Sequence, residues 1–346
     1  MPAARTRNIG ANAAFDFRPP SGGAAADSLA FRSIGLMQDI LIVLNERAGS
    51  LLDRDPREVK AELQRRFARP GRTVDVVLAR GRRIARAIDR GARSDYDTII
   101  VGGGDGSLSY AAQRLAATGK ALGVLPLGTV NLLARDIGVP TELEGAIDAV
   151  EAAVPRAIDL GVLNGRPFHT LSGVGFFSQM ARAREETRDL PGRVLRVMAA
   201  AARALRRAGR FTLDISVDGR ARQIDSVAVL VTVNCFSGEE WRRASLDEGT
   251  LELHTVEDTS ALGKLKAAAD LLTGAWRDNP GIQSVRAQRV TIDGNRTRAW
   301  VATDGELVRE RAPLVYEIRP RVLKVLVPPA AATQAKDNAF RDRAAG

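Results

Sequence analysis

The sequence predicts an α/β protein of two domains, a doubly wound parallel sheet followed by an antiparallel β-sandwich. Three observations lead to this prediction. Apolar, strand-like runs alternate with helical patterns over the first part of the chain, as they do in parallel sheets. A glycine-rich loop at 102–106 follows one of these runs directly. After Pro155, hairpin signals such as the Asn-Gly pair at 164–165 and the Asp-Gly pair at 218–219 indicate antiparallel pairing.

Length and composition narrow the class of protein. The chain of 346 residues is long enough for two domains, and its 45% hydrophobic content can supply their cores. A net charge of +10 favours an anionic partner. No apolar run reaches the ~20 residues of a spanning helix, and no signal peptide is recognisable. One cysteine, Cys235, excludes an internal disulfide, so a cytoplasmic location is expected.

The first domain is expected at 38–155, after a flexible tail at 1–37 that is rich in Ala, Gly, Pro and Arg. Its expected strands are short apolar runs at 40–44, 73–78, 98–101 and 121–125. Its expected helices are the segments between and after them, at 56–68, 82–90, 107–117 and 142–153. This order of elements predicts a parallel sheet with helices on both faces.

The second domain is expected at 156–312. Its strand-like segments lie at 157–163, 167–172, around the second hairpin turn within 211–234, and at 298–303, with a further Asp-Gly turn at 293–294. Helical patterns follow 173 and cover 260–273. A last strand-like segment, 313–328, is expected to return to the first domain, and 329–346 to form a second flexible tail.

The glycine-rich loop has the chemistry of an anion site. It lies where a buried strand ends and a helix begins, and ligands of open α/β sheets bind at such points. Glycine lets the backbone approach an anion closely, and a helix N-terminus adds partial positive charge. Asp105 would repel a phosphate unless a cation lay between them, which indicates Mg²⁺ carried in with a nucleotide. Taken alone, the loop fits a plain strand-to-helix turn equally well.

Two other loops favour the nucleotide interpretation. The loop at 126–131 follows the next strand, and Thr129 is expected to cap the helix after it while facing the same crevice. A third loop, with Asn45 and Gly49, follows the first strand. Neither glycine motif fits the Walker pattern, because the Lys-Ser/Thr pair is missing.

The motif GGGDGS at 102–107, followed by PLGTVNLLARDIGVP at 126–140, resembles the catalytic domain of the diacylglycerol kinase and sphingosine kinase superfamily, which is distantly similar to NAD kinases. The resemblance covers roughly residues 38–328 and implies an NAD kinase-like nucleotide domain that uses ATP and Mg²⁺. The residues that it places at the nucleotide are Asn45, Gly49, Gly103, Gly104, Asp105, Gly106, Ser107, Gly128, Thr129 and Asn131. Two positions depart from the family pattern, Glu46 in place of a proline and Phe177 in place of an acid.

The resemblance also implies a catalytic base. Asp304-Gly305-Glu306 is similar to an Asp-Gly-Glu of the family whose glutamate is the proposed proton acceptor. Phosphorylating an alcohol needs a base within hydrogen-bond reach of the hydroxyl, so Glu306 is expected to fill this role. Asp105 resembles the acid proposed as the base in sphingosine kinases and is the alternative, although we assign it mainly to Mg²⁺ and nucleotide.

A turn at 245–250 is a second candidate cation site. Ser245, Asp247, Glu248 and Thr250 offer hard oxygen ligands at a density that suits Mg²⁺ or Ca²⁺. The residues alone favour an exposed acidic turn. Bacterial lipid kinases of the family have a structural Mg²⁺ at a similar turn, and by that resemblance Glu248 is the preferred ligand.

Six arginines fall within one arc of a helix: Arg193, Arg196, Arg203, Arg206, Arg207 and Arg210. A solvated helix face and a basic surface held against anionic lipid headgroups explain this arc equally well. The isolated His169 and His254 are expected in strands with satisfied rings, and Cys235 as a small apolar filler.

Together these features predict an ATP-dependent lipid kinase that phosphorylates diacylglycerol to a phosphatidic-acid-like product. It would act at an anionic membrane surface as a peripherally associated protein. The alternatives are a sphingosine or ceramide kinase, an NAD kinase-like enzyme, and a nucleotide-binding regulator without turnover. Nucleic acid is not expected as a partner, because the basic residues come without a recognition module. A homodimer is left open.

Overall fold

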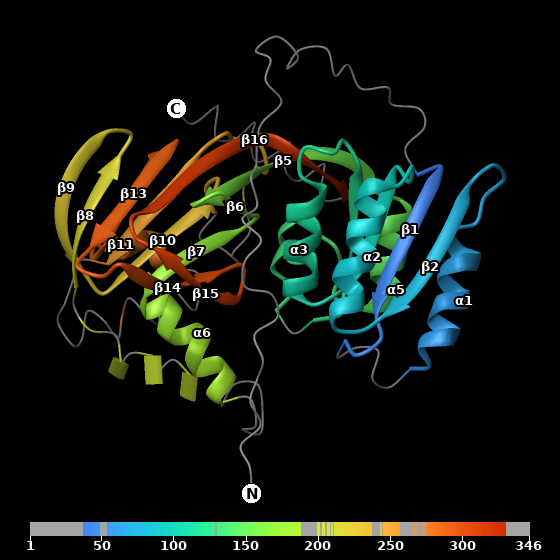
Figure 1. Cartoon of the computed structure of the whole chain (residues 1–346), viewed down its shortest axis with the longest axis horizontal. Coiled ribbons are helices and arrows are strands. Elements are labelled where there is room, and N and C mark those ends of the chain that lie inside the picture. The colour runs from blue at the N-terminus through green and yellow to red at the C-terminus, as the bar shows by residue number, and fades with distance from the viewer. Residues whose placement is uncertain are drawn as a thin grey trace, which may run out of the picture.

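The computed structural model describes residues 37–48, 54–128, 130–187, 211–236, 245–256 and 275–329, together with a few positions between 199 and 270. These residues form two lobes, joined along the top of Figure 1 by the long strand β16. The first lobe is the expected α/β domain and the second is the expected β-sandwich, so the predicted fold class is confirmed.

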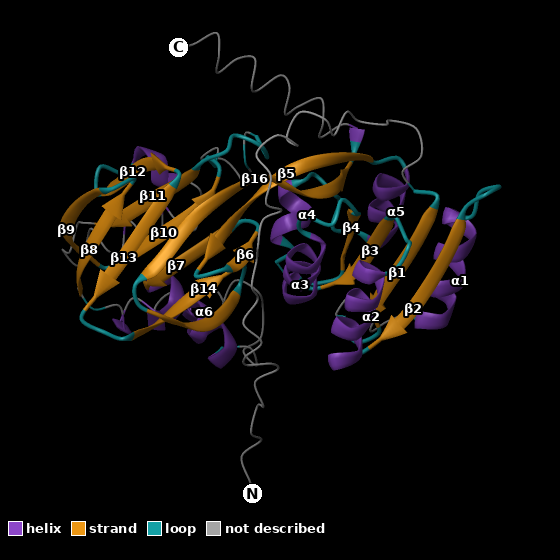
Figure 2. Cartoon of the chain, turned by 45° about the horizontal axis from the view of Figure 1, so that its top comes forward, coloured by secondary structure: helices purple, strands orange, loops and turns teal. Residues whose placement is uncertain are grey.

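The first lobe is built on four parallel strands in the order β2-β1-β3-β4. Their bounds are Asp39–Asn45 (β1), Thr73–Ala79 (β2), Thr98–Gly103 (β3) and Ala121–Pro126 (β4). The helices are Pro56–Phe67 (α1), Arg82–Arg93 (α2), Asp105–Leu115 (α3), Leu132–Asp136 (α4) and Leu143–Glu151 (α5). α1 contacts α5 and α2 contacts α3, and Figure 2 shows these pairs on opposite faces of the sheet.

The apolar runs of the sequence form the interior of this sheet. All six residues of β3 and all six of β4 are buried, because helices cover both faces. Glycine is needed where α2 packs on the sheet, since a methyl group at Gly91 would lie 2.8 Å from the side chain of Leu41. The core of this lobe therefore holds rigid the strand ends from which the loops emerge.

The second lobe stacks two sheets. A six-stranded antiparallel sheet has the order β12-β11-β10-β7-β14-β15 and faces β9, β8, β13 and part of β16. The bounds are Val154–Leu163 (β5), Arg166–Phe168 (β6), Leu171–Gly175 (β7), Phe211–Val217 (β8), Arg220–Ser226 (β9), Ala228–Val233 (β10), Leu251–Val256 (β11), Ile282–Ala287 (β12), Arg289–Gly294 (β13), Arg298–Thr303 (β14), Glu306–Arg311 (β15) and Leu314–Val327 (β16). Helix α6 (Phe176–Glu186) contacts β7, β10, β14 and β15, and a 3-10 helix, η2, spans Ala275–Asp278.

β16 belongs to both lobes. Its first residues pair with β13 in the sandwich, and Lys324 and Val325 pair in parallel with Ala121 and Leu122 of β4. β5 follows β16 along both halves. The parallel sheet and one sandwich sheet are therefore a single ten-stranded sheet, whereas the sequence analysis treated them as two sheets with a returning strand.

Some elements differ from the expectations. α3 begins at Asp105 rather than at 107, which places Asp105 and Gly106 in the first helical turn. Met37, assigned to the tail, is buried and its backbone N–H donates to Asp97. The rest of that tail, residues 330–346 and most of the helix expected at 260–273 lie outside the described residues. None of the described helices is long and apolar enough to cross a membrane.

Candidate active site

Three loops meet at one edge of the parallel sheet. Leu44 of β1 pairs with Gly102 of β3, and Gly103 pairs with Pro126 of β4, so these strands end side by side. The strand order reverses between β1 and β3, and ligands of open α/β sheets bind at such a switch point. The structure thus brings together the loops that sequence analysis assigned to the nucleotide.

The two glycine loops touch through their backbones. A methyl group at Gly128 would lie 2.6 Å from the Cα atom of Gly104, and one at Gly104 would lie 3.5 Å from that of Gly128. The Leu127 N–H donates to the carbonyl of Gly103 at 3.0 Å. Only glycine fits at 128 without separating the loops, so the spacing of the two loops is built into the sequence.

Asp105 fastens the second loop to the first. Its carboxylate accepts hydrogen bonds from the backbone N–H groups of Asn131 at 3.1 Å and Leu132 at 2.7 Å, at the start of α4. Asn131 occupies the N-cap position and its side chain bonds both backbone groups of Gly128. Asp105 therefore serves the start of α4, the role expected of Thr129, which lies outside the described residues. Its predicted contact with Mg²⁺ stays a prediction.

The start of α3 fits a phosphate. Gly104 is the N-cap residue and supplies no side-chain cap, and the first amides of a helix have no partner within the helix. Such amides and the helix dipole favour an anion. Ser107 is partly exposed in the same turn, and Asn45 lies beside Gly103. These residues form a cradle that suits the phosphates of ATP. Gly49, also assigned to the nucleotide, lies outside the described residues.

Glu306 reaches this cradle from the second lobe. It is the first residue of β15, after the turn at 304–305, and a methyl group at Gly106 would lie 2.1 Å from its Oε1 atom. The carboxylate expected to be the base and the helix start expected to bind phosphate are thus adjacent. They come from residues 200 positions apart in the sequence, which no local pattern could place together.

The surroundings of Glu306 raise its pKa above the usual value of a glutamate. Partial removal from water is the main cause, although the residue as a whole keeps solvent contact, and the negative charges of Asp304 and Asp105 add to it. Arg166 opposes the shift. A carboxylate with a raised pKa is a better proton acceptor, so this environment suits a general base.

Replacing Gly106 with Ala tests this adjacency. The added methyl group meets the end of a flexible side chain, so the fold is expected to survive while the Glu306 carboxylate is displaced. We expect kcat to fall at least tenfold with the melting temperature nearly unchanged. Gly145→Ala, at another helical glycine without a positive φ and with its nearest atom 3.3 Å away, would separate this effect from the general effect of adding a methyl group. A G106A variant with normal kcat would show that the position of Glu306 is unimportant.

Asp304 is a buried hub that the sequence analysis read only as part of a turn. Its carboxylate is fully buried and accepts hydrogen bonds from the backbone N–H groups of His169, Thr170 and Leu171, at 2.9, 2.9 and 3.2 Å. Ser109 of α3 donates to it at 3.4 Å. Asp304 therefore joins the β6–β7 connection to α3 and fixes the turn that carries Glu306.

We expect Asp304→Asn to lower the free energy of unfolding by about 2–4 kcal/mol, because an amide group cannot replace a carboxylate that faces several donors in a buried site. Urea unfolding monitored by circular dichroism measures the loss. Asp293→Asn provides a control at an exposed Asp-Gly pair that ends β13, where the carboxylate accepts from the N–H of Gly294. Equal stabilities for the two variants would contradict the role of Asp304.

The turn at 245–250 has protein partners. Ser245 donates to Asp247 at 2.7 Å, Glu248 accepts from the N–H of Cys235 at 3.4 Å, and Thr250 donates to the carbonyls of Leu251 and Ala287. Within the described part of the chain, no group of three or more His, Cys, Asp or Glu side chains is placed to hold a metal ion. The assignment of a metal ion to this turn stays a prediction.

Two other buried carboxylates were missed by sequence reasoning. Asp136 at the end of α4 pairs with Arg243, and both side chains are almost fully buried. Asp159 of β5 accepts from the N–H groups of Gly249 and Arg321. Asp136 ties the first lobe to the second, and Asp159 ties the shared sheet to the turn at 245–250. Each pairs residues far apart in the chain, so the sequence carries no signal for them.

Cys235 behaves as the expected filler. It is buried, and burial with the nearby charges of Glu252 and Glu248 raises the pKa of its thiol to about 12. We expect no reaction with a thiol reagent in the folded protein at pH 8, and one thiol per chain in guanidinium chloride. Fast labelling of the native protein would contradict this burial. His254 is also neutral, because burial and Arg277 lower its pKa to about 3.

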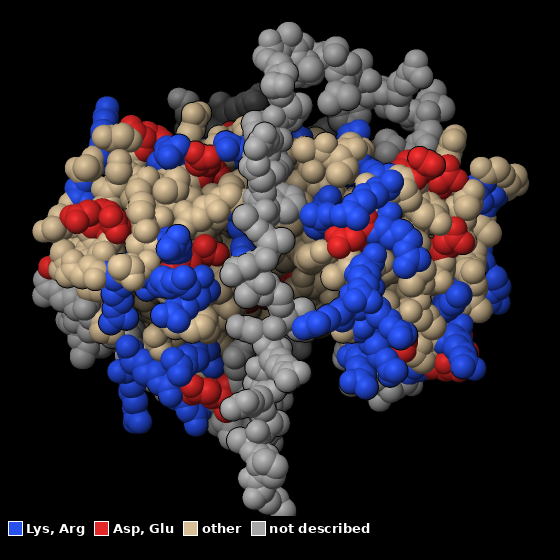
Figure 3. Space-filling model, in the orientation of Figure 1, with Lys and Arg blue, Asp and Glu red and all other residues tan. Residues whose placement is uncertain are grey.

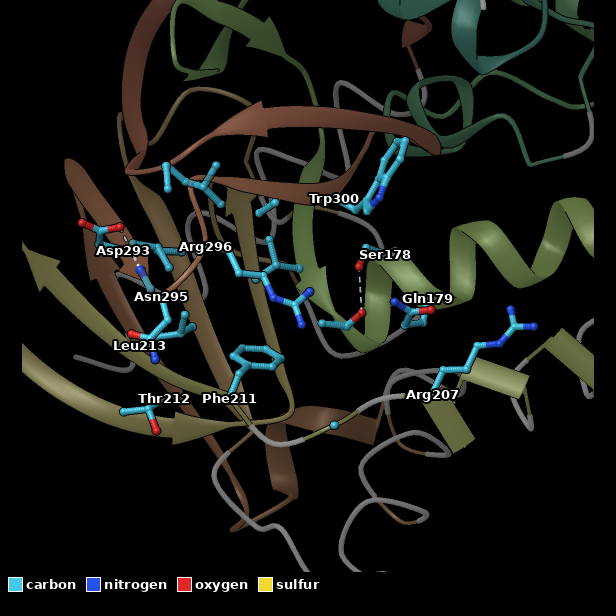
Figure 4. Close-up of a pocket in the computed structure, with 18 residues that line it drawn as sticks. Ser178, Gln179, Arg207, Phe211, Thr212, Leu213, Asp293, Asn295, Arg296 and Trp300 are labelled. Carbon is cyan, nitrogen blue, oxygen red and sulfur yellow. Dashed lines mark hydrogen bonds between the residues drawn. The ribbon is translucent and has the colours of Figure 1, made fainter.

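The second lobe contains a cavity of about 670 Å³. Figure 4 shows Phe211, Gln179 and Trp300 among the residues around it. Its lining comes from β7, β8, β13, β14 and the start of α6, and it mixes apolar side chains with polar and charged ones, among them Arg296 and Arg207. Its size is that of a small-molecule site.

Comparisons with known proteins agree with this arrangement. Residues 39–163 match the diacylglycerol kinase catalytic domain, and 172–327 match the YegS C-terminal NAD kinase beta sandwich-like domain. A crystal structure from Bacillus anthracis has the same fold, with a TM-score of 0.69, 21% sequence identity, and coverage of 87% of this chain and 99% of that one.

Several curated relatives match part of this chain. The diacylglycerol kinase of Bacillus subtilis is 29% identical over 64% of this chain and 74% of its own. A YegS-like lipid kinase of Pseudomonas syringae pv. tomato is 38% identical over 31% of this chain and 36% of its own. The chain covers 58% of an uncharacterized Synechocystis protein that is 24% identical. With both domain matches in the expected order over most of its length, the chain belongs to the family of diacylglycerol kinase-like lipid kinases.

Proposed function

We propose that this protein transfers the γ-phosphoryl group of ATP to the hydroxyl group of diacylglycerol. The observation that supports this most is the placement of the Glu306 carboxylate against Gly106, in the first turn of the helix that begins at the glycine-rich loop. A phosphate-binding helix start and a proton acceptor are the two groups that phosphorylation of an alcohol needs side by side.

In this proposal the glycine loops position the phosphates of ATP at the start of α3, where backbone amides stabilise negative charge. Glu306 accepts the proton of the lipid hydroxyl as its oxygen attacks the γ-phosphorus. The bond from the γ-phosphorus to the bridging oxygen breaks, and ADP leaves. A divalent cation bound with ATP would neutralise phosphate charge, and Asp105 is the carboxylate that would face it.

The cavity of the second lobe supports a lipid as the acceptor. Trp300, which lines it, lies three residues before Thr303 on β14, and three residues of strand span about 10 Å. Glu306 follows directly after the turn that begins at Asp304. The apolar part of the cavity lining suits hydrocarbon, so the cavity offers a lipid acceptor an apolar site in the same lobe as Glu306.

The test is incubation of the full chain with γ-labelled ATP, Mg²⁺ and vesicles that contain diacylglycerol, sphingosine and ceramide in equal amounts, with NAD in solution. Product analysis by chromatography identifies the acceptor. The proposal predicts labelled phosphatidic acid. Label in sphingosine phosphate, ceramide phosphate or NADP would replace diacylglycerol with another acceptor. ATP binding without any labelled product would indicate a regulator without turnover.

A further inference from the structure

One face of the β14–β15 hairpin combines an exposed tryptophan with arginines. Trp300 pairs with Arg309 and Arg298 pairs with Arg311, so these four side chains lie on the same side of the sheet. We call them the hairpin face. The next residue, Val301, is fully buried in the sandwich, which shows that the hairpin face points outward.

Trp300 is unusual among the described residues. The residue is 45% exposed. Among the described residues, the other large hydrophobic side chains with comparable exposure are Val154 and Val285. The guanidinium group of Arg309 lies 5.9 Å from the centre of its ring. Arg298, Arg309 and Arg311 are all exposed. The hairpin face is thus apolar at its centre and positively charged around it.

Basic side chains continue along the same side of the molecule. Figure 3 shows them gathered over β14, β15 and α6 on the second lobe, and over α2 on the first. On α2 the exposed members are Arg82, Arg83, Arg86, Arg90 and Arg93. Near α6 they include Arg203, Arg206 and Arg207, of which Arg207 pairs with Glu186. Both lobes therefore present positive charge to one partner surface.

We propose that the hairpin face docks the protein on a bilayer of anionic phospholipids. Tryptophan is favoured at the headgroup level of a membrane, and guanidinium groups bind phosphate oxygens in pairs. A second lobe with one aromatic side chain among arginines, on a chain with net charge +10, matches an extended negative surface. Trp300 also lines the cavity, so docking brings the cavity close to the leaflet. The use of a lipid from that leaflet as substrate rests on the proposed function, whereas docking does not.

The first test is binding to vesicles of phosphatidylcholine and phosphatidylglycerol, measured by sedimentation at low salt. Arg298→Gln with Arg309→Gln is expected to weaken binding roughly 10- to 30-fold, and Trp300→Ala also weakens it. The control for the arginine pair is Arg57→Gln with Arg65→Gln, at two exposed arginines of α1, which lies on the face of the parallel sheet opposite to α2. The control for Trp300→Ala is Val285→Ala, at a valine of β12 that is 44% exposed. Equal effects of the hairpin and control variants would overturn the proposal.

The second test locates the contact. Trp276 is 1% exposed, so in a Trp241→Phe background bromine-labelled phospholipids should quench mainly Trp300. We expect quenching on vesicle binding that disappears in Trp300→Phe. Vesicle binding without quenching of Trp300 would place the membrane contact on another surface and overturn the proposal.

Activity separates this proposal from the proposed function. Phosphorylation of diacylglycerol in vesicles should fall with binding in the double variant of Arg298 and Arg309, while its phosphorylation of a short-chain diacylglycerol in solution should keep its kcat, because neither arginine lines the cavity. Docking through Trp300 without phosphorylation of any lipid would leave this proposal standing and remove the proposed function. If no hairpin variant changes the kinase activity in vesicles, the proposed function stands and the docking proposal is wrong.

Discussion

Replacing Glu306 with Gln is expected to lower kcat by about 10²- to 10⁴-fold, the usual loss when a general base is removed. The side chain keeps its size, and in the proposed function the phosphates are held by backbone groups of the other lobe. Nucleotide affinity, measured by calorimetry, should therefore stay nearly unchanged. Loss of ATP binding with normal kcat would place Glu306 at the nucleotide instead.

The pH dependence gives an independent readout of the same group. A base acts only when it is deprotonated, so activity should be lost as pH falls through the pKa of Glu306. Partial removal from water, Asp304 and Asp105 raise this pKa in the free protein, which moves the acidic limb of the kcat/KM profile above the range of an ordinary glutamate. In E306Q this limb should disappear from the residual activity. Glu310→Gln is the control, since burial also raises the pKa of Glu310 on the same strand but Glu310 does not lie against Gly106.

Replacing Gly128 with Ala should have the second large effect. The methyl group would lie 2.6 Å from the Cα atom of Gly104, and backbone cannot move aside as a side chain does. Overpacking of this kind costs about 1–3 kcal/mol and here separates the two loops. We expect nucleotide affinity and kcat/KM to fall at least tenfold, together with a lower melting temperature.

Gly104→Ala is the matched control for this variant. It adds the same methyl group to the opposite loop, where the nearest atom is 3.5 Å away, an ordinary contact, at a backbone φ of −85° that alanine adopts freely. It should keep most of the stability and much of the affinity. If the two variants behave alike, the close contact of the loops does not set the geometry of the site.

Sequence alone could predict that the glycine loops lie together because their signals are local. Buried parallel strands such as β3 appear as continuous apolar runs, and glycines directly after them mark a loop near a ligand. The carboxyl ends of parallel strands meet at one edge, so three loops far apart in the chain could be brought together by topology alone. The boundary of α3 was two residues off, since Asp105 and Gly106 look like loop residues but begin the helix.

The contribution of the second lobe was harder to predict, because it depends on tertiary contacts. The Asp-Gly pairs that begin at Asp218, Asp293 and Asp304 look alike in sequence. Asp218 bonds the N–H groups of Gln288 and Arg289 at the surface, whereas Asp293 lies in β13 rather than in the expected turn and bonds the N–H of Gly294. Asp304 instead bonds three N–H groups of another connection while fully buried. The resemblance to a kinase motif singled out Glu306, whereas nothing local distinguished its neighbour.

The shared ten-stranded sheet has the same origin. The segment 314–327 shows one strand, but its partners are β13 at one end and β4 at the other. Such pairings join residues that are far apart in the sequence. The alternation of apolar and polar residues predicts which face of a strand is buried, but it does not predict which strands lie beside it. This strand and the pair of Asp136 with Arg243 hold the two lobes in the arrangement that places Glu306 at the glycine loops.

The central claim is that loops of one lobe and a carboxylate of the other form one active site. The most direct measurement is single-turnover transfer from γ-labelled ATP to diacylglycerol, with nucleotide binding measured on the same preparations of the wild-type protein, E306Q and G128A. The account predicts normal binding with almost no transfer in E306Q, and loss of both in G128A. Transfer at the wild-type rate by folded E306Q would contradict it.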